Sequence, residues 1–270
     1  MNEPLEKPAS LDDSYRTVYG PVRSWRVGLS LGIDLLSVNS ICSLRCVYCQ
    51  LGKINVHTTA RKVYVSTATV MSDLASSNWQ LVDVITLSGS GEPTLATNIG
   101  EVIEQAKALT GKPILVITNS AHLHVPEVRR DILGADKIFC KLDAADEQTL
   151  KWMDRPCEGI TLHQIVTGIR QLRAEYKGFL AIQTMLTRIN RDRLNGLAEI
   201  LLAIRPDEVQ LNLPSRPIPP TWEISTRGGT KTREGKLLKP LSYGEVLDFR
   251  ERLILATGLS VVAAPNNLTQ

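Results

Sequence analysis

The chain has 270 residues, a formal net charge of +3 at neutral pH, and 43% hydrophobic and 22% charged residues. These values are ordinary for a soluble globular protein, and the length suits one domain with a full core. No apolar run approaches the roughly 18 residues that would span a membrane, and the first 25 residues lack the apolar core of a secretory signal. We therefore expect a cytoplasmic protein without membrane contact, whose small charge does not by itself indicate nucleic-acid binding.

From residue 31 onward, short apolar runs alternate with segments of helical periodicity. The runs have the length and β-branched content of buried strands. They cover residues 31–38, 81–88, 113–119, 137–143, 179–186 and 208–213. The helical segments cover residues 68–75, 99–109, 127–133, 162–176, 194–204 and 243–256. This alternation predicts an α/β fold of parallel βαβ units, arranged as a single-domain partial (β/α)6 barrel. A doubly wound open sheet is the alternative architecture.

The two ends of the chain lack the regular alternation of the middle. Residues 1–30 show no clear periodicity and include the turn formers Gly20-Pro21, so we expect an N-terminal arm lying over the barrel. The barrel core is expected over residues 31–214. Residues 215–270 are expected to form a C-terminal basic loop and a helix packed on the barrel, with 261–264 either a seventh strand or a tail.

Basic residues dominate the segment 216–239. Against Glu223 and Glu234 it carries Arg216, Arg227, Lys231, Arg233, Lys236 and Lys239. Such a loop is either a solvated surface or a contact for the phosphates of RNA or of a cofactor. Arg216, which lies among prolines at the predicted barrel mouth, suits an anionic substrate group.

Three of the five cysteines, Cys42, Cys46 and Cys49, lie in one short loop after the first predicted strand. Thiolates are soft ligands that select zinc, copper(I) or iron–sulfur clusters. A structural zinc site normally has four protein ligands, whereas Cys140 and Cys157 lie far along the chain. Three thiolates would leave one iron of a cubane cluster free to bind a small molecule. A zinc site, a disulfide and a reduced thiol cluster are the alternatives.

A glycine-rich segment, Ser88-Gly89-Ser90-Gly91-Glu92-Pro93-Thr94, follows the second predicted strand. Active sites of parallel α/β folds form at the carboxyl ends of strands, so this segment should lie near the cysteines. Its glycines allow the backbone to approach a ligand, and Glu92 can orient an ammonium group. A glycine turn capped by serine is the structural alternative.

Polar residues also follow three later strands. Asn119 can contact a ribose or a carboxylate, or else cap a helix. Period-two alternation places Lys141 and Asp143 on one face, where a desolvated lysine can act as a nucleophile or simply form an ion pair with the aspartate. Gln183 is a candidate pocket hydrogen-bonder or a barrel-filling residue. Cys140 is expected in the core, and Cys157 in a loop without a role.

The C-x3-C-x2-C spacing, with Tyr48 immediately before the third cysteine, resembles the cluster loop of the radical S-adenosylmethionine (SAM) superfamily. The segment 88–93 is similar to that superfamily's Gly-Gly-Glu-Pro stretch, with Ser90 in place of the first glycine. The resemblance implies a [4Fe-4S] cluster whose open iron chelates SAM, and SAM contacts from Tyr48 and from residues 88–93. It further implies reductive cleavage of SAM to methionine and a 5′-deoxyadenosyl radical, with an electron donor such as a flavodoxin or ferredoxin.

Within this superfamily, several stretches look like the tRNA wyosine-base synthases, over roughly residues 30–250. They are Ser-Gly-Glu-Pro-Thr-Leu, Lys-Leu-Asp-Ala-Ala-Asp-Glu, Asp-Arg-Pro and Gln-Leu-Asn-Leu-Pro-Ser-Arg-Pro. In those synthases a second cluster is ligated by upstream cysteines, whereas this chain has none before Cys42. The substrate is therefore left open between a tRNA base, a small molecule, and a partner protein or peptide modified by a maturase. A zinc-binding scaffold is the non-enzymatic alternative.

Overall fold

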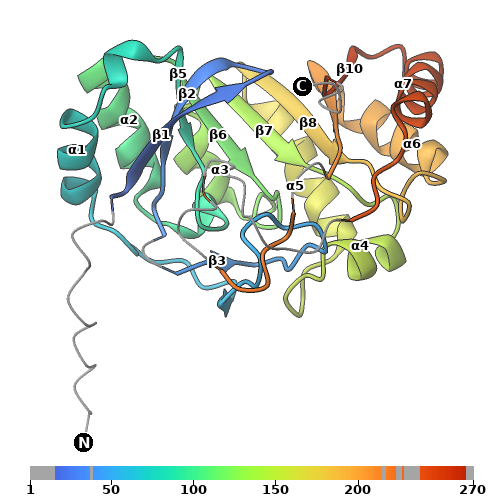
Figure 1. Ribbon diagram of the computed structural model, residues 1–270, viewed down its shortest axis with the longest axis horizontal. Coiled ribbons are helices and arrows are strands. Elements are labelled where there is room, and N and C mark those ends of the chain that lie inside the picture. Colours follow the sequence, from blue (N-terminus) through green and yellow to red (C-terminus); the bar gives the residue numbers. More distant parts are fainter. Residues whose placement is uncertain (1–15, 37–38, 215–216, 223–226, 228–237, 266–270) are drawn as a thin grey trace, which may run out of the picture.

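The computed structural model describes residues 16–36, 39–214, 217–222, 227 and 238–265. Its centre is an eight-stranded sheet with the order β1-β2-β5-β6-β7-β8-β9-β10 (Figure 1). The strands are β1 (Val18–Ser24), β2 (Gly28–Ile33), β5 (Val84–Leu87), β6 (Ile114–Thr118), β7 (Lys137–Lys141), β8 (Phe179–Met185), β9 (Glu208–Asn212) and β10 (Val261–Ala263). All neighbouring strands run parallel except the antiparallel hairpin β1–β2.

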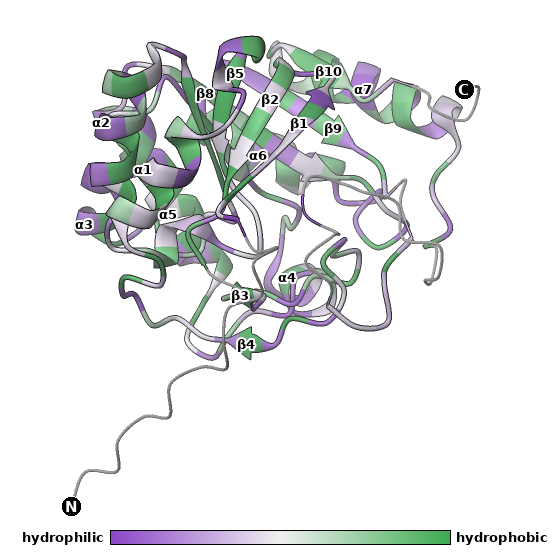
Figure 2. Ribbon diagram, turned by 60° about the vertical axis from the view of Figure 1, so that its left-hand side comes forward, coloured by the Kyte–Doolittle hydropathy of each residue, from purple (hydrophilic) through white to green (hydrophobic). Residues whose placement is uncertain are grey.

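Helices connect successive parallel strands and cover the sheet from outside (Figures 1 and 2). They are α1 (Thr67–Ala75), α2 (Ile99–Thr110), α3 (Pro126–Ile132), α4 (Glu147–Met153), α5 (Leu162–Glu175), α6 (Leu194–Ile204) and α7 (Tyr243–Thr257). Local signals set several ends: Thr161 and Ser242 form capping boxes at α5 and α7, and Gly111 ends α2 in the left-handed conformation.

The two faces of the sheet pack differently. Strand residues such as Ile85, Val116 and Ile138 belong to the large core shared with the helices. Their neighbours Val84 and Leu115 point the other way, into a small separate cluster with Phe139 and Ala181. Because alternate residues of a strand face opposite sides, the second cluster lies inside the curled sheet, and it leaves the rest of that interior available for a site.

The predicted α/β fold with a partial parallel barrel is confirmed, and each of the six predicted strands is present. The N-terminal segment differs from the expected arm, because Val18–Ser24 forms β1 and β2 begins at Gly28 rather than at residue 31. Turn-forming residues obscure the strand alternation in this segment, and β1 is held in place by its pairing with β2.

Two further elements complete the barrel. The seven-residue α4 is too short to show helical periodicity, so the sequence did not predict it. Residues 261–263, which could have been strand or tail, form β10 parallel to β9, and α7 packs between α6 and β10. Among the described residues, no helix combines the length and apolar character needed to cross a membrane.

Candidate active site

The loop that carries Cys42, Cys46 and Cys49 follows the carboxyl end of β2. Its first residues form β3 (Ile41–Cys42), which pairs in parallel with β4 (Val56–His57). All three cysteines are free thiols and are half-buried. The loop is thus folded back on itself, with its sulfur atoms partly shielded from solvent.

The end of α4 holds the other side of this loop. The Arg45 N–H donates to the Asp154 carbonyl at 2.9 Å, and the Val47 N–H donates to the Met153 carbonyl at 2.9 Å. Backbone hydrogen bonds of this kind fix the path of an otherwise irregular segment. The unpredicted helix α4 therefore has a direct part in positioning the cysteines.

The glycine-rich segment after β5 contacts the cysteine loop directly. The Ile41 N–H donates to the Ser90 carbonyl at 2.8 Å, and the Glu92 N–H donates to the Ile41 carbonyl at 3.0 Å. Gly91 lies between these bonds with φ of 150°, and a Cβ atom there would come within 1.7 Å of the Ile41 oxygen. Only glycine permits this approach, so Gly91 joins the two motifs that the sequence predicted to meet.

Glu92 connects the ends of β5 and β6. Its carboxylate accepts hydrogen bonds from the Thr94 N–H and hydroxyl, from the Thr118 hydroxyl, and from the Asn119 N–H, at 2.6–3.0 Å. The residue is 1% exposed, and Pro93 begins the short 3-10 helix after it. These four bonds show that the carboxylate organises the loops, a role that the sequence did not indicate.

Asn119 lies against the cysteine loop. Its amide nitrogen donates to the Ser43 hydroxyl at 3.0 Å and to the Cys42 sulfur at 3.4 Å. The side chain therefore contacts the first cysteine, while the backbone N–H of the same residue contacts Glu92. Asn119 links the thiol site to the glycine-rich segment.

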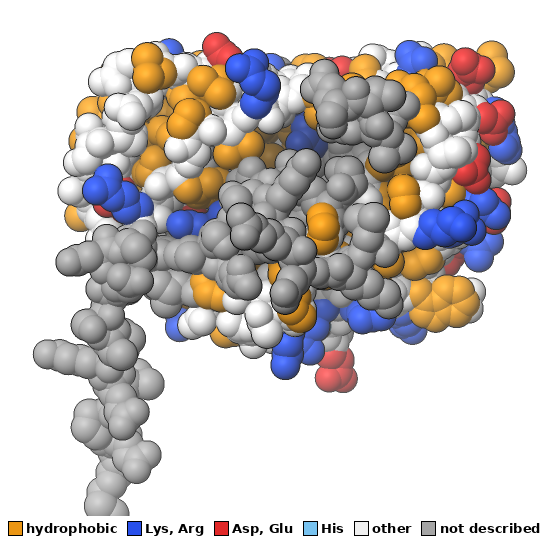
Figure 3. Space-filling model, viewed as in Figure 1, with side chains coloured by type: hydrophobic (Ala, Val, Ile, Leu, Met, Phe, Trp, Pro, Cys, Tyr) orange, Lys and Arg blue, Asp and Glu red, His pale blue; other side chains and the backbone are white. Residues whose placement is uncertain are grey.

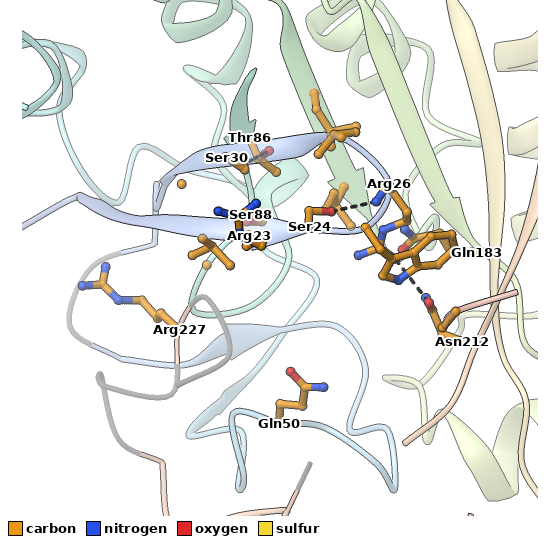
Figure 4. Close-up of a pocket in the computed structure, with 18 of the residues that line it drawn as sticks. Arg23, Ser24, Arg26, Ser30, Gln50, Thr86, Ser88, Gln183, Asn212 and Arg227 are labelled. Carbon is orange, nitrogen blue, oxygen red and sulfur yellow. Dashed lines mark hydrogen bonds between the residues drawn. The ribbon is translucent and has the colours of Figure 1, made fainter. Parts of the chain in front are cut away.

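A cavity of about 410 Å³ opens beside this site, on the inner side of the sheet (Figure 4). Ser88, Gly89 and Gln183, three of the residues predicted to contact SAM, line it. The Ser88 hydroxyl lies 2.7 Å from that of Tyr19, and the Gln183 amide donates to Gln210 at 3.0 Å. The cavity brings together residues of β1, β5, β8 and β9.

Asp34 is a site residue that the sequence reasoning missed. Its carboxylate accepts from the Ser90 N–H at 3.1 Å and from the Ser90 hydroxyl at 2.6 Å, and it forms an ion pair with Arg227 at 3.1 Å. Burial raises the pKa of Asp34, while its partners act in the opposite direction. The one available signal was Ser90 itself, a hydroxyl donor where the superfamily pattern has glycine.

Lys141 and Asp143 lie together, as strand alternation predicted, but with a third charged partner. The Lys141 ammonium lies 3.0 Å from Asp143 and 2.5 Å from Asp154. Asp143 also accepts hydrogen bonds from the Tyr48 hydroxyl and from the Met185 N–H. The hydroxyl of Tyr48, a residue predicted to contact SAM, ties the cysteine loop to this buried charge cluster.

The ion pairs decide the protonation state of Lys141. Burial alone would lower its pKa, but the carboxylates of Asp143 and Asp154 outweigh burial and raise the pKa well above its usual range. The lysine is therefore held as an ammonium, which favours the ion-pair alternative over a nucleophilic amine in this state.

Other residues singled out by the sequence have simpler surroundings. Cys140 is fully buried in the core. Cys157 is half-buried in the loop after α4, as a free thiol. Arg216 and most of the basic segment 216–239 lie outside the described residues.

The sequence model of the radical SAM superfamily matches residues 36–201, more than half of the chain. The chain belongs to the radical SAM superfamily. A UPF0026 protein from Synechocystis sp. is 47% identical over 264 residues, which cover 94% of this chain and 98% of the relative. The protein is a radical SAM enzyme, and membership implies SAM and an iron–sulfur cluster as cofactors.

Solved structures of radical SAM proteins share this fold. SuiB of Streptococcus suis, bound to SAM, superposes with a TM-score of 0.62 at 14% identity, over 86% of this chain and 50% of SuiB. Archaeal TYW1 superposes with a TM-score of 0.54 at 14% identity, over 88% of this chain and 76% of TYW1. This radical SAM chain spans only half the length of SuiB.

The chemistry of the three thiols in this radical SAM enzyme suits the binding of a positively charged cluster. Burial raises the pKa of Cys42 to about 12, and it also raises the pKa of Cys46 and Cys49. Thiols must lose their protons to bind iron, so they become ligands only when a strongly positive group compensates for burial. The Lys141 ammonium adds positive charge near Cys46 and Cys49.

The described residues contain no three His, Cys, Asp or Glu side chains gathered closely enough to hold a metal ion. The three thiols are therefore not arranged as a closed single-ion site. Their fit to the radical SAM cluster rests on the number, kind and order of the ligands in the loop.

His122, in the turn after β6 of this radical SAM domain, should make stability depend on pH. It is 6% exposed, and neither ring nitrogen has a hydrogen-bond partner in the described part of the chain. Burial, with smaller effects of His124 and Arg61, lowers the pKa of His122 from 6.5 to about 4. The unfolded chain therefore binds a proton that the folded chain rejects, and stability should fall as the pH drops from about 6.5 to 4.

This effect amounts to at most about 3 kcal/mol of unfolding free energy. Urea denaturation between pH 4 and 7.5 measures it, and His122→Phe should flatten the profile over that range. If the unfolding free energy changed equally with pH in the wild type and in His122→Phe, the assignment to His122 would be contradicted.

Proposed function

We propose that this enzyme binds a [4Fe-4S] cluster through Cys42, Cys46 and Cys49 and cleaves SAM reductively. When bound and reduced, such a cluster supplies the electron that splits SAM into methionine and a 5′-deoxyadenosyl radical. The observation that carries the proposal is the backbone junction at Ile41, which places the thiol loop against Gly91. The two halves of the proposed cofactor site are thereby fixed relative to one another.

The chain's own residues then have distinct tasks. Backbone groups of residues 88–91 and the side chains of Asn119 and Gln183 are proposed to contact SAM. Glu92 and Asp34 hold that segment in shape through their buried hydrogen bonds. Lys141, Asp143 and Tyr48 are proposed to hold the cysteine loop and to place a positive charge beside the thiolates.

Basic side chains near the cysteine loop suit an acidic electron donor such as a flavodoxin or ferredoxin. Arg45, inside the loop, and Arg155, after α4, are both exposed. Figure 3 shows Lys and Arg side chains along the lower edge of the molecule, on the side where Figure 1 places β3 and α4. Complementary charge would accelerate the encounter with such a donor. We place this exchange in the cytoplasm, where oxygen-sensitive clusters survive best.

A tRNA base is the proposed substrate class. The support is the sequence similarity to wyosine-base synthases in the stretches after β7 and β9. Because no cysteine precedes Cys42, a reaction that depends on a second, upstream cluster is not proposed.

SAM cleavage tests the proposed function directly. After anaerobic reconstitution we expect about four irons and four sulfides per chain, and dithionite reduction with SAM should yield 5′-deoxyadenosine. Cys42→Ala should lose both the cluster and the product, because it leaves two of the three ligands. Cys157→Ala is the matched control and should retain both. Zinc in place of iron, or equal product from Cys42→Ala and the wild type, would overturn the proposal.

A further inference from the structure

We infer that the β1–β2 hairpin forms an oxyanion subsite, where Arg23 and Arg26 bind the phosphate or carboxylate of a planar substrate. This inference rests on the proposed function, because it assigns the substrate to the cavity beside the SAM contacts. It adds the chemical class of the group that is bound and the residues that select it.

The hairpin lies at the opposite end of the cavity from the glycine-rich segment. β2 and β5 run parallel, with Ser30 beside Val84 and Ile33 beside Leu87. The hairpin turn precedes β2, whereas Ser88 follows β5, so the cavity extends from the amino end of these strands to their carboxyl end. A SAM molecule at the Ser88 end would leave the hairpin end for the substrate.

The hairpin also contacts β9 through a side chain of its turn. The Arg26 guanidinium donates to Asn212 on β9 at 3.4 Å and lies over the rings of Trp25 at 5.3 Å and Phe139 at 6.0 Å. Figure 4 shows Arg26, Gln183 and Asn212 grouped on one side of the cavity, away from Arg227. Arg26 thus connects the β1–β2 hairpin to β9, and both residues of this contact line the cavity.

The charged residues of the cavity lining are all basic. Arg23, Arg26 and Arg227 line it, and none of the described lining residues is acidic. Arg227 is paired with Asp34, outside the lining. The exposed Arg23 side chain has no ion pair or hydrogen bond with any described residue. Such a lining attracts oxyanions, which arginine can bind in a bidentate manner, and it disfavours cationic substrates.

An aromatic surface accompanies these charges. Trp25 lines the cavity and is 40% exposed. An exposed indole is a platform on which a planar ring can stack. The cavity of about 410 Å³ is near the lower end of small-molecule sites, so beside a bound SAM molecule it leaves room for only a small planar group and not for a folded peptide.

Calorimetric titration of the reconstituted enzyme, with its SAM site saturated, tests the subsite. The probes are guanosine, cytidine and uridine 5′-monophosphates, the corresponding nucleosides, and benzoate. Adenosine compounds are avoided because they can compete for the SAM site. Binding of the monophosphates alone would identify phosphate as the anion, and binding of benzoate as well would extend the subsite to carboxylates. The inference would be overturned if neither the monophosphates nor benzoate bound, or if the nucleosides bound as tightly as the monophosphates.

Variants assign the binding to the hairpin. Arg23→Gln should weaken monophosphate or benzoate binding about tenfold or more, and the loss should shrink as salt is added. Because Arg23 is exposed, this change should leave the fold intact. Arg170→Gln, an exposed arginine on α5, is the matched control and should bind as the wild type does. Equal affinities of Arg23→Gln and the wild type would contradict the assignment.

The two proposals fail separately. Loss of SAM cleavage in the wild type with intact, Arg23-dependent anion binding would refute only the proposed function. Normal SAM cleavage without anion binding would refute only the oxyanion subsite.

Discussion

Gly91→Ala is expected to destabilise the protein by about 3 kcal/mol or more and to prevent assembly of the cofactor site. The added Cβ would lie 1.7 Å from the Ile41 oxygen, far inside van der Waals contact, and φ at Gly91 is 150°. Relief requires the glycine-rich segment to move away from the cysteine loop, which breaks the hydrogen bonds of Ile41 to Ser90 and Glu92. Urea denaturation of the apoprotein and iron content after reconstitution measure the two consequences.

Gly111→Ala separates the two causes of this effect. Gly111 also has positive φ, at 63°, but a Cβ there would have no atom within 4 Å. Alanine at that position should cost only about 1–2 kcal/mol, the usual penalty of the left-handed conformation, and should leave iron binding unchanged. If Gly91→Ala resembled Gly111→Ala in both measurements, the close approach at Ile41 would not matter for the site.

The local motifs explain how much of the site the sequence could predict. Cys42, Cys46 and Cys49 are close in sequence, and the glycine-rich segment carries its own pattern, so each is recognisable from a few consecutive residues. Strand alternation placed Lys141 and Asp143 on one face because that relation spans only two residues.

The missing parts depend on long-range pairing. Asp34 is 56 residues from Ser90 and 193 from Arg227, and nothing in its local sequence marks it as a buried anchor. Asp154 lies 13 residues from Lys141, across a helix too short to be predicted. Such partners become visible only when the fold brings their strands and loops together. The same holds for β1, whose order comes from its pairing with β2.

These buried carboxylates also change the interpretation of the predicted residues. Glu92 and Asp143 each accept several hydrogen bonds or ion pairs from neighbouring segments. Carboxylates held in this way orient the segments that carry their donors. The site is therefore built as a rigid frame around the thiol loop, and the groups left to contact a substrate lie on the cavity side, at the hairpin.

Lys141→Met is expected to destabilise the apoprotein by about 3–5 kcal/mol, because it leaves two buried carboxylates without their cation. The side chains of Asp143 and Asp154 are 0% and 2% exposed, so solvent cannot compensate for the loss. Repulsion between them should loosen the contact of Tyr48 with Asp143, and with it the cysteine loop. Urea denaturation and iron content after reconstitution measure both effects.

Lys141→Arg distinguishes a structural cation from a nucleophilic amine. Arginine keeps the positive charge, so it should recover most of the stability and iron binding lost in Lys141→Met, and 5′-deoxyadenosine should still form. A guanidinium cannot form an imine with a carbonyl substrate, so a nucleophilic role would leave substrate turnover absent in Lys141→Arg while SAM cleavage persisted. An arginine variant as unstable as Lys141→Met would instead show that the compact ammonium itself is needed between the two carboxylates.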